Sequence, residues 1–146
     1  MTTSELSKKI ALLSNDMPIN YYISSVEKLL NKYKSTLFCD KEQKKIDSNP
    51  KYKIFMQKYN IYIKIKNYKC EKADYLCTGY MNYQIGNYKF YINFSGEYGD
   101  CEYFLEDEIS VIELVEEIIK KNNLINISTD NFLLDLKDII DRLEFI

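Results

Sequence analysis

The alternation of apolar and polar positions is clearest in the middle of the chain. From Ile61 to Tyr68, isoleucines alternate with tyrosines and lysines, which predicts a half-buried strand with Tyr68 on its polar face. Further along, Gly86-Asn87 separates two alternating runs, as the two-residue loop of a hairpin does. The register set by that loop predicts four pairs on one apolar face: Ile85 with Tyr88, Tyr83 with Phe90, Met81 with Ile92, and Gly79 with Phe94.

Apolar residues recur at helical spacing before this region. A short helix is expected around Leu6, and a second helix is expected over residues 20–34. The stripe of the second helix consists of Ile23, Val26, Leu30 and Tyr33. Residues 39–50 are polar and predict a loop, whereas residues 51–58 fit a helical turn or a strand.

The C-terminal third predicts one more strand and two helices. The strand runs from Cys101 to Leu105. Ser110 and Glu113 have the spacing of a capping box, which marks the start of the first helix. The second helix begins near Asp130.

Together these elements predict an α+β fold. We expect an antiparallel β-sheet of about four strands, with two N-terminal and two C-terminal helices packed mainly on one face. Residues 1–146 are expected to form a single globular domain. Within it, residues 1–38 are helical, 51–105 form the antiparallel sheet, and 106–146 are helical and acidic.

Composition narrows the chemistry that remains available. The chain has no histidine, which removes His-based triads and the commonest transition-metal ligand. The four cysteines include no CxxC pair, so partly buried, reduced thiols are expected. We therefore expect no enzymatic activity and predict no catalytic, cofactor-binding or metal-binding residue.

Apolar runs are all shorter than the roughly 18 residues needed to cross a bilayer, and the N-terminus lacks the apolar core of a signal peptide. No membrane partner is expected. The predicted location is the cytoplasm, or the host cytoplasm if the protein is viral.

Charge is distributed very unevenly along the chain. Residues 95–117 carry nine acidic side chains and no Lys or Arg. Residues 1–96 hold 16 Lys and 8 Asp or Glu, a net charge of +8, whereas residues 97–146 hold 4 Lys or Arg and 14 Asp or Glu, a net charge of −10. Such asymmetry favours a charged partner, although the two halves can also neutralise each other within the fold.

The first hypothesis is a binding protein of the toxin-immunity type, which neutralises a basic toxin or nuclease through an acidic C-terminal surface. A phage counter-defence protein of the anti-CRISPR type, which mimics nucleic acid to block an effector, is an alternative that uses the same surface. Tyrosines are included as the aromatic anchors typical of interfaces. The predicted partner-binding residues are Glu97, Tyr98, Asp100, Glu102, Tyr103, Glu106, Asp107 and Glu108.

A further alternative is binding of single-stranded nucleic acid to the polar face of the sheet. Tyrosines on that face offer stacking platforms beside lysine charges. Six residues carry this hypothesis: Tyr62, Lys64, Lys66, Tyr80, Lys89 and Tyr91. A homodimer is also open, because an unpaired strand edge near Cys101–Leu105 or Ile61–Tyr68 can pair between two copies.

Overall fold

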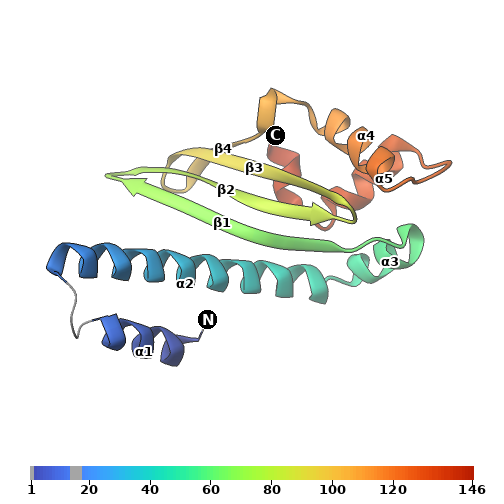
Figure 1. Cartoon of the computed structure of the whole chain (residues 1–146). Coiled ribbons are helices and arrows are strands. Elements are labelled where there is room, and N and C mark those ends of the chain that lie inside the picture. Colours follow the sequence, from blue (N-terminus) through green and yellow to red (C-terminus); the bar gives the residue numbers. More distant parts are fainter. Residues whose placement is uncertain (1, 14–17) are drawn as a thin grey trace.

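The computed structural model describes residues 2–13 and 18–146, and these residues confirm the α+β architecture (Figure 1). In this part of the chain three α-helices precede a four-stranded sheet and two α-helices follow it. The helices are α1 (Thr3–Leu13), α2 (Ile19–Ser48), α3 (Pro50–Tyr59), α4 (Val111–Lys121) and α5 (Thr129–Lys137). The strands are β1 (Ile63–Ala73), β2 (Leu76–Ile85), β3 (Tyr88–Glu97) and β4 (Asp100–Leu105), and two 3-10 helices are η1 (Glu106–Glu108) and η2 (Asp141–Phe145).

The sheet is an antiparallel meander with the order β1-β2-β3-β4. The hairpin of β2 and β3 has the predicted register, and all four predicted apolar pairs are present. Gly86 occupies the turn with a φ of 57°, in the left-handed region that glycine tolerates best. The turn and the alternation therefore specify one register, as expected.

The helices cover the apolar face and one edge of the sheet. Figure 1 shows α2 running alongside β1, with α1 on the side of α2 that faces away from the sheet. One apolar cluster joins buried residues of the sheet to residues of α2, α3, α4, α5 and η2. Within this cluster, Phe132 of α5 lies against Phe55 and Tyr59 of α3, with ring centroids 5.5 and 4.7 Å away.

The predicted loop at residues 39–50 is wrong, because α2 continues to Ser48. This segment is rich in Lys, Glu and Gln, which are good helix formers, and contains no Gly or Pro before Pro50. Asn49 then adopts an extended conformation, as the residue before a proline prefers, and its side chain caps α3. The segment was predicted to be a loop because one of the two positions that it buries, Glu42, is charged, and Ile46 is the other.

The sheet begins at Ile63 and not at residue 51, because residues 50–59 form α3. A β-bulge between Ile65 and Asn67 breaks the strict alternation of β1. The bulge turns Tyr68 to the apolar side, where its ring stacks on Phe38 at 3.8 Å, so its predicted polar-face position is wrong. The expected apolar stripe of α2 is also poorly covered, since half of Ile23 remains exposed.

The two edges of the sheet differ in how their backbone is protected. Along β1, the Gln43 side chain accepts a hydrogen bond from the Ile65 N–H and donates one to the Ile63 carbonyl. The Tyr52 hydroxyl contacts both backbone groups of Ile63, and the Ser35 hydroxyl accepts from the Tyr68 N–H. These side chains occupy backbone groups of the Ile61–Tyr68 edge, one of the two edges at which pairing between copies was left open.

The opposite edge is formed by β4, the last strand in the order. In the described residues no side chain bonds to its outer backbone groups. Of the two edges considered for pairing with another chain, the β4 edge is therefore the accessible one.

Asn122, at the end of α4, ties that helix to the turn between β2 and β3. Its Oδ1 accepts from the Asn87 N–H at 2.8 Å, and its Nδ2 donates to the carbonyls of Ile85 and Ile118 at 3.1 and 2.9 Å. Because Asn122→Ala leaves these groups unsatisfied, we expect the free energy of unfolding to fall by about 2 kcal/mol. Urea denaturation measures this, with the exposed Lys121→Ala as control. Equal loss in both variants would contradict the role of Asn122.

Candidate functional site

Six of the predicted partner-binding residues are acidic, and all six side chains are exposed. Glu97 and Asp100 pair across the Tyr98-Gly99 turn at the tip of the β3–β4 hairpin. Glu102 lies within β4, and the three acids of η1 follow its other end. The carboxylates thus extend along an edge strand about 17 Å long. We call this set the acidic row: Glu97, Asp100, Glu102, Glu106, Asp107 and Glu108.

The acidic row makes no ion pair with any described residue. Two other acids of the C-terminal half are neutralised within the fold, because Asp135 of α5 and Asp138 at its C-cap pair with Lys58 and Lys51 of α3 at 3.0 and 3.3 Å. The charge asymmetry of the sequence is therefore partly satisfied between α3 and the end of α5. The acidic row on the β4 side is part of the negative charge that these ion pairs leave uncompensated.

Asp135 illustrates a carboxylate with a structural role. Partial burial would raise its pKa, but hydrogen bonds from Tyr59 and Lys58 outweigh that effect and hold the pKa below its usual value. The Tyr59 hydroxyl donates to it at 2.5 Å and the Lys58 ammonium at 3.0 Å. Such contacts are missing from the acidic row, whose side chains meet solvent.

The two predicted aromatic anchors have different environments. Tyr98 is 65% exposed at the hairpin tip, where its hydroxyl and ring both contact the Lys72 ammonium. Tyr103 is half-buried on the apolar side, near Phe94 and Phe145. Sequence reasoning missed Phe104, which is 42% exposed. Tyr103 and Phe104 are consecutive and both aromatic, so the sequence does not indicate which of the two side chains faces solvent.

An apolar groove lies beside the acidic row, between β4 and helices α4 and α5. Its volume is about 820 Å³. Glu102 and Glu108 border it, and the residues that line it include Ile109, Ile112 and Leu133. We call it the β4 groove. Glu102, Glu108 and Lys137 beside an apolar centre give this groove the polar rim and apolar core of a protein–protein interface.

The residues predicted for nucleic-acid binding also come together in part. Lys64, Gln84 and Lys89 form one row across β1, β2 and β3 on the polar face. Tyr80 and Tyr91 lie on the same face, in edge-to-face contact at 5.2 Å. The remaining two lie outside the regular pairing of the sheet, because Tyr62 precedes β1 and is exposed and Lys66 is the bulged residue, but both line one hollow with Lys64.

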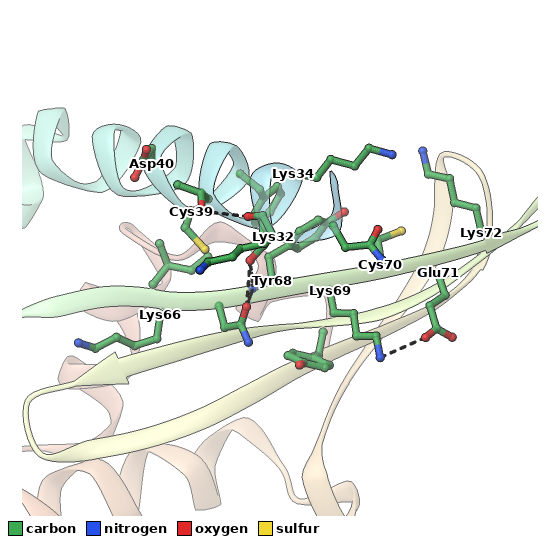
Figure 2. Close-up of a pocket in the computed structure, with 17 residues that line it drawn as sticks. Lys32, Lys34, Cys39, Asp40, Lys66, Tyr68, Lys69, Cys70, Glu71 and Lys72 are labelled. Carbon is green, nitrogen blue, oxygen red and sulfur yellow. Dashed lines mark hydrogen bonds and ion pairs between the residues drawn. The ribbon is translucent and has the colours of Figure 1, made fainter. Parts of the chain in front are cut away.

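A second groove, with a volume of about 1160 Å³, runs between α2 and β1 (Figure 2). We call it the lysine groove because five lysines line it: Lys32, Lys34, Lys66, Lys69 and Lys72. Sequence reasoning missed it. The lysines of α2 and β1 are more than thirty residues apart, and residues 39–50 were expected to be a loop, so nothing placed the two sets together.

The four cysteines are free thiols, as expected. Burial raises the pKa of Cys39, which lines the lysine groove, so this thiol stays protonated and weakly reactive at neutral pH. Among the described residues, no group of three or more His, Cys, Asp or Glu is arranged to hold a metal ion. None of the helices in residues 2–13 and 18–146 has the length and apolarity to cross a membrane.

The chain matches no protein-family model, no curated protein and no solved structure. Function is therefore inferred from the two grooves and the charges around them.

Proposed function

We propose that this protein binds a basic protein partner through the acidic row and the adjoining β4 groove, and so neutralises that partner in the cytoplasm. The observation that carries the proposal is the row of six exposed carboxylates without an internal ion pair. Folding leaves these carboxylates without an ion pair to a described residue, whereas Asp135 and Asp138 pair with lysines of α3. Unpaired charge on one surface steers association with a surface of opposite sign.

The chemistry of the row favours a partner that itself handles nucleic acid. The carboxylates of the row present the same sign of charge as a phosphate backbone, so they fit a basic surface built for phosphates. A toxin or nuclease held by an immunity-type inhibitor is the first choice. A nucleic-acid-binding effector blocked by a phage counter-defence protein would meet the same residues.

The β4 groove supplies the apolar contact that charge alone does not. Phe104 is 42% exposed beside Glu102 in β4. Interfaces bury an apolar centre inside a polar rim, and aromatic residues contribute much of their affinity. We infer that the carboxylates set orientation and association rate, and that the groove accepts an apolar side chain of the partner.

The test compares two variants with equal change in net charge. The row variant carries Glu102→Lys, Glu106→Lys and Glu108→Lys, and the control carries Glu5→Lys, Glu27→Lys and Glu116→Lys, which lie on α1, α2 and α4. Tagged proteins capture partners from the native host, and the partner found is then titrated by calorimetry. We expect the row variant to bind about 100-fold more weakly and the control to bind within about 3-fold of the wild type.

Circular dichroism confirms that both variants are folded. The proposal fails if the row variant keeps full affinity, or if the partner that the wild type captures is acidic. Phe104→Ala gives a second measurement, because loss of an aromatic anchor is expected to raise the dissociation rate about 10-fold without changing the salt dependence of association.

A further inference from the structure

The lysine groove gathers cations from two elements that are distant in sequence. Lys32 and Lys34 come from α2, and Lys66, Lys69 and Lys72 come from β1 (Figure 2). The volume of about 1160 Å³ is slightly larger than the roughly 300–1,000 Å³ of small-molecule sites, so the groove has room for a short polymer segment. A codon bias toward lysine raises the number of lysines in a chain, but it does not place five of them around one hollow.

Four of these five lysines have no ion-pair partner among the described residues. Lys69 pairs with Glu71 at 3.1 Å, and the Lys72 ammonium is engaged by Tyr98. Lys32, Lys34 and Lys66 make no ion pair with any described residue. The lining contains only two acids, Asp40 and Glu71. The groove is therefore electropositive in a protein whose net charge is −2.

The local structure holds the groove open and makes part of its wall polar. The bulge after Ile65 takes Lys66 out of register, and bulges often re-aim a side chain beside a functional site. Ser35 donates to the Asn67 side chain at 2.9 Å and accepts from the Tyr68 N–H, so α2 meets this part of β1 through hydrogen bonds. Such a wall suits phosphate and sugar better than an apolar molecule.

Aromatic side chains add a means of holding bases. Tyr80 lines the groove, and its ring is at 87° to that of Tyr91, so Tyr91 leaves at least one face of the Tyr80 ring uncovered. Tyr68 is unsuited to stacking, because Phe38 already covers its ring. A neighbouring hollow of about 430 Å³ shares Lys66 and continues past Lys64 to the exposed Tyr62.

We propose that the lysine groove binds single-stranded nucleic acid. The lysines hold the phosphate chain, and Tyr80 and Tyr62 stack on bases. From Lys66 to Lys72 the groove follows about 20 Å of strand, which suits a site on the order of four nucleotides. The lysine groove lies at the opposite edge of the sheet from β4 (Figure 1). The two sites adjoin across the polar face, because Lys69 and Tyr80 line a further hollow with Glu106, Asp107 and Glu108 of the acidic row. Of the polar-face residues, it uses Tyr62, Lys64, Lys66 and Tyr80 but not Lys89 or Tyr91.

The experiment measures fluorescence anisotropy of a labelled 20-nucleotide oligothymidylate at low and moderate salt. The groove variant carries Lys32→Glu, Lys34→Glu and Lys66→Glu. The control has the same change in net charge, through Lys89→Glu, Lys120→Glu and Lys121→Glu, all outside the groove. We expect the groove variant to bind at least 10-fold more weakly, with a salt slope reduced by about 2, and the control to change less than about 3-fold.

Three further binding measurements identify the class of ligand. Tyr80→Ala is expected to weaken oligothymidylate binding about 5- to 30-fold, whereas Tyr80→Phe keeps it and shows that the fold is intact. Inorganic polyphosphate is expected to be insensitive to Tyr80→Ala, and a duplex of equal length is expected to bind more weakly than the single strand.

Several results would overturn the inference. These are equal weakening in the groove variant and the control, tighter binding of polyphosphate or duplex than of the single strand, and absence of salt-sensitive binding at about micromolar protein. The acidic-row variant is expected to keep groove binding, so failure of the groove and failure of the proposed protein partner are separate outcomes.

Discussion

Replacing Phe132 by alanine is expected to lower the free energy of unfolding by about 4 kcal/mol, the largest effect of any single substitution considered for this chain. Phe132 is fully buried, and its ring joins Phe55 and Tyr59 of α3 to α5. The substitution removes the transfer free energy of the ring and leaves a cavity between elements that come from the two halves of the chain.

Chemical denaturation of the wild type and the variant measures this loss as a shift of the midpoint at constant slope. Leu134→Ala is the matched control, because Leu134 lies on the same helix, is 63% exposed and is expected to change stability by less than about 0.5 kcal/mol. Phe132→Leu is expected to retain most of the stability. If Phe132→Ala costs no more than Leu134→Ala, the junction between α3 and α5 does not contribute as the structure implies.

The sequence allowed the sheet to be predicted where two independent signals agreed. In the β2–β3 hairpin, the Gly86-Asn87 turn and the alternation specify the same register, and every predicted pair is present. The capping box of Ser110 and Glu113 was likewise predicted from spacing and is formed in the structure. These elements depend on local chemistry, which a single sequence displays directly.

Features that depend on distant contacts could not be predicted. The segment that continues α2 looked like a loop because Glu42 stands where a helix stripe normally has an apolar residue, and its partner Arg142 is 100 residues away. The bulge after Ile65 reverses the side of Tyr68 without any glycine to mark it. The lysine groove likewise depends on the distant contact between α2 and β1. Only those of its residues that lie on the sheet could therefore be predicted from the sequence.

The structure converts the charge asymmetry along the sequence into a separation in space. The lysine groove lies at the β1 edge of the sheet, and the acidic row lies at the β4 edge. The ion pairs Lys51–Asp138 and Lys58–Asp135 neutralise part of the positive charge of the N-terminal half and part of the negative charge of the C-terminal half. The sites proposed for a basic partner and for an anionic chain therefore use surfaces of opposite sign, which adjoin where Lys69 and Tyr80 line a hollow with the acids of η1.

A buried ion pair underlies the second large effect on stability. Glu42 of α2 is 8% exposed, and it accepts hydrogen bonds from both terminal nitrogens of Arg142 at 2.9 and 3.4 Å. Arg142 also reaches the Tyr83 hydroxyl at 3.5 Å, and burial raises the pKa of that tyrosine to about 12. Glu42→Ala leaves a guanidinium without its counter-charge, so the free energy of unfolding is expected to fall by about 3 kcal/mol.

Two comparisons separate the charge from the packing in this pair. The exposed Asp40→Ala on the same helix is expected to cost less than about 0.5 kcal/mol. The double variant Glu42→Leu with Arg142→Met replaces both charges by apolar groups, and it is expected to recover most of the stability lost in Glu42→Ala. A double variant as unstable as the single one would show that packing, and not the unpaired charge, causes the loss.

The pH dependence of stability gives an independent test of the same pair. Burial would raise the pKa of Glu42, but the hydrogen bonds and charge of Arg142 outweigh it and hold the pKa below the ordinary value of 4.5. Because the folded protein binds this proton less readily than the unfolded chain, the stabilisation is complete above that value and is lost as the pH falls through the lower, folded pKa. The stability difference between the wild type and Glu42→Gln is therefore expected to shrink as the pH falls below 4.5. A difference that stays constant as the solution is acidified would mean that Glu42 does not stabilise the fold through its charge.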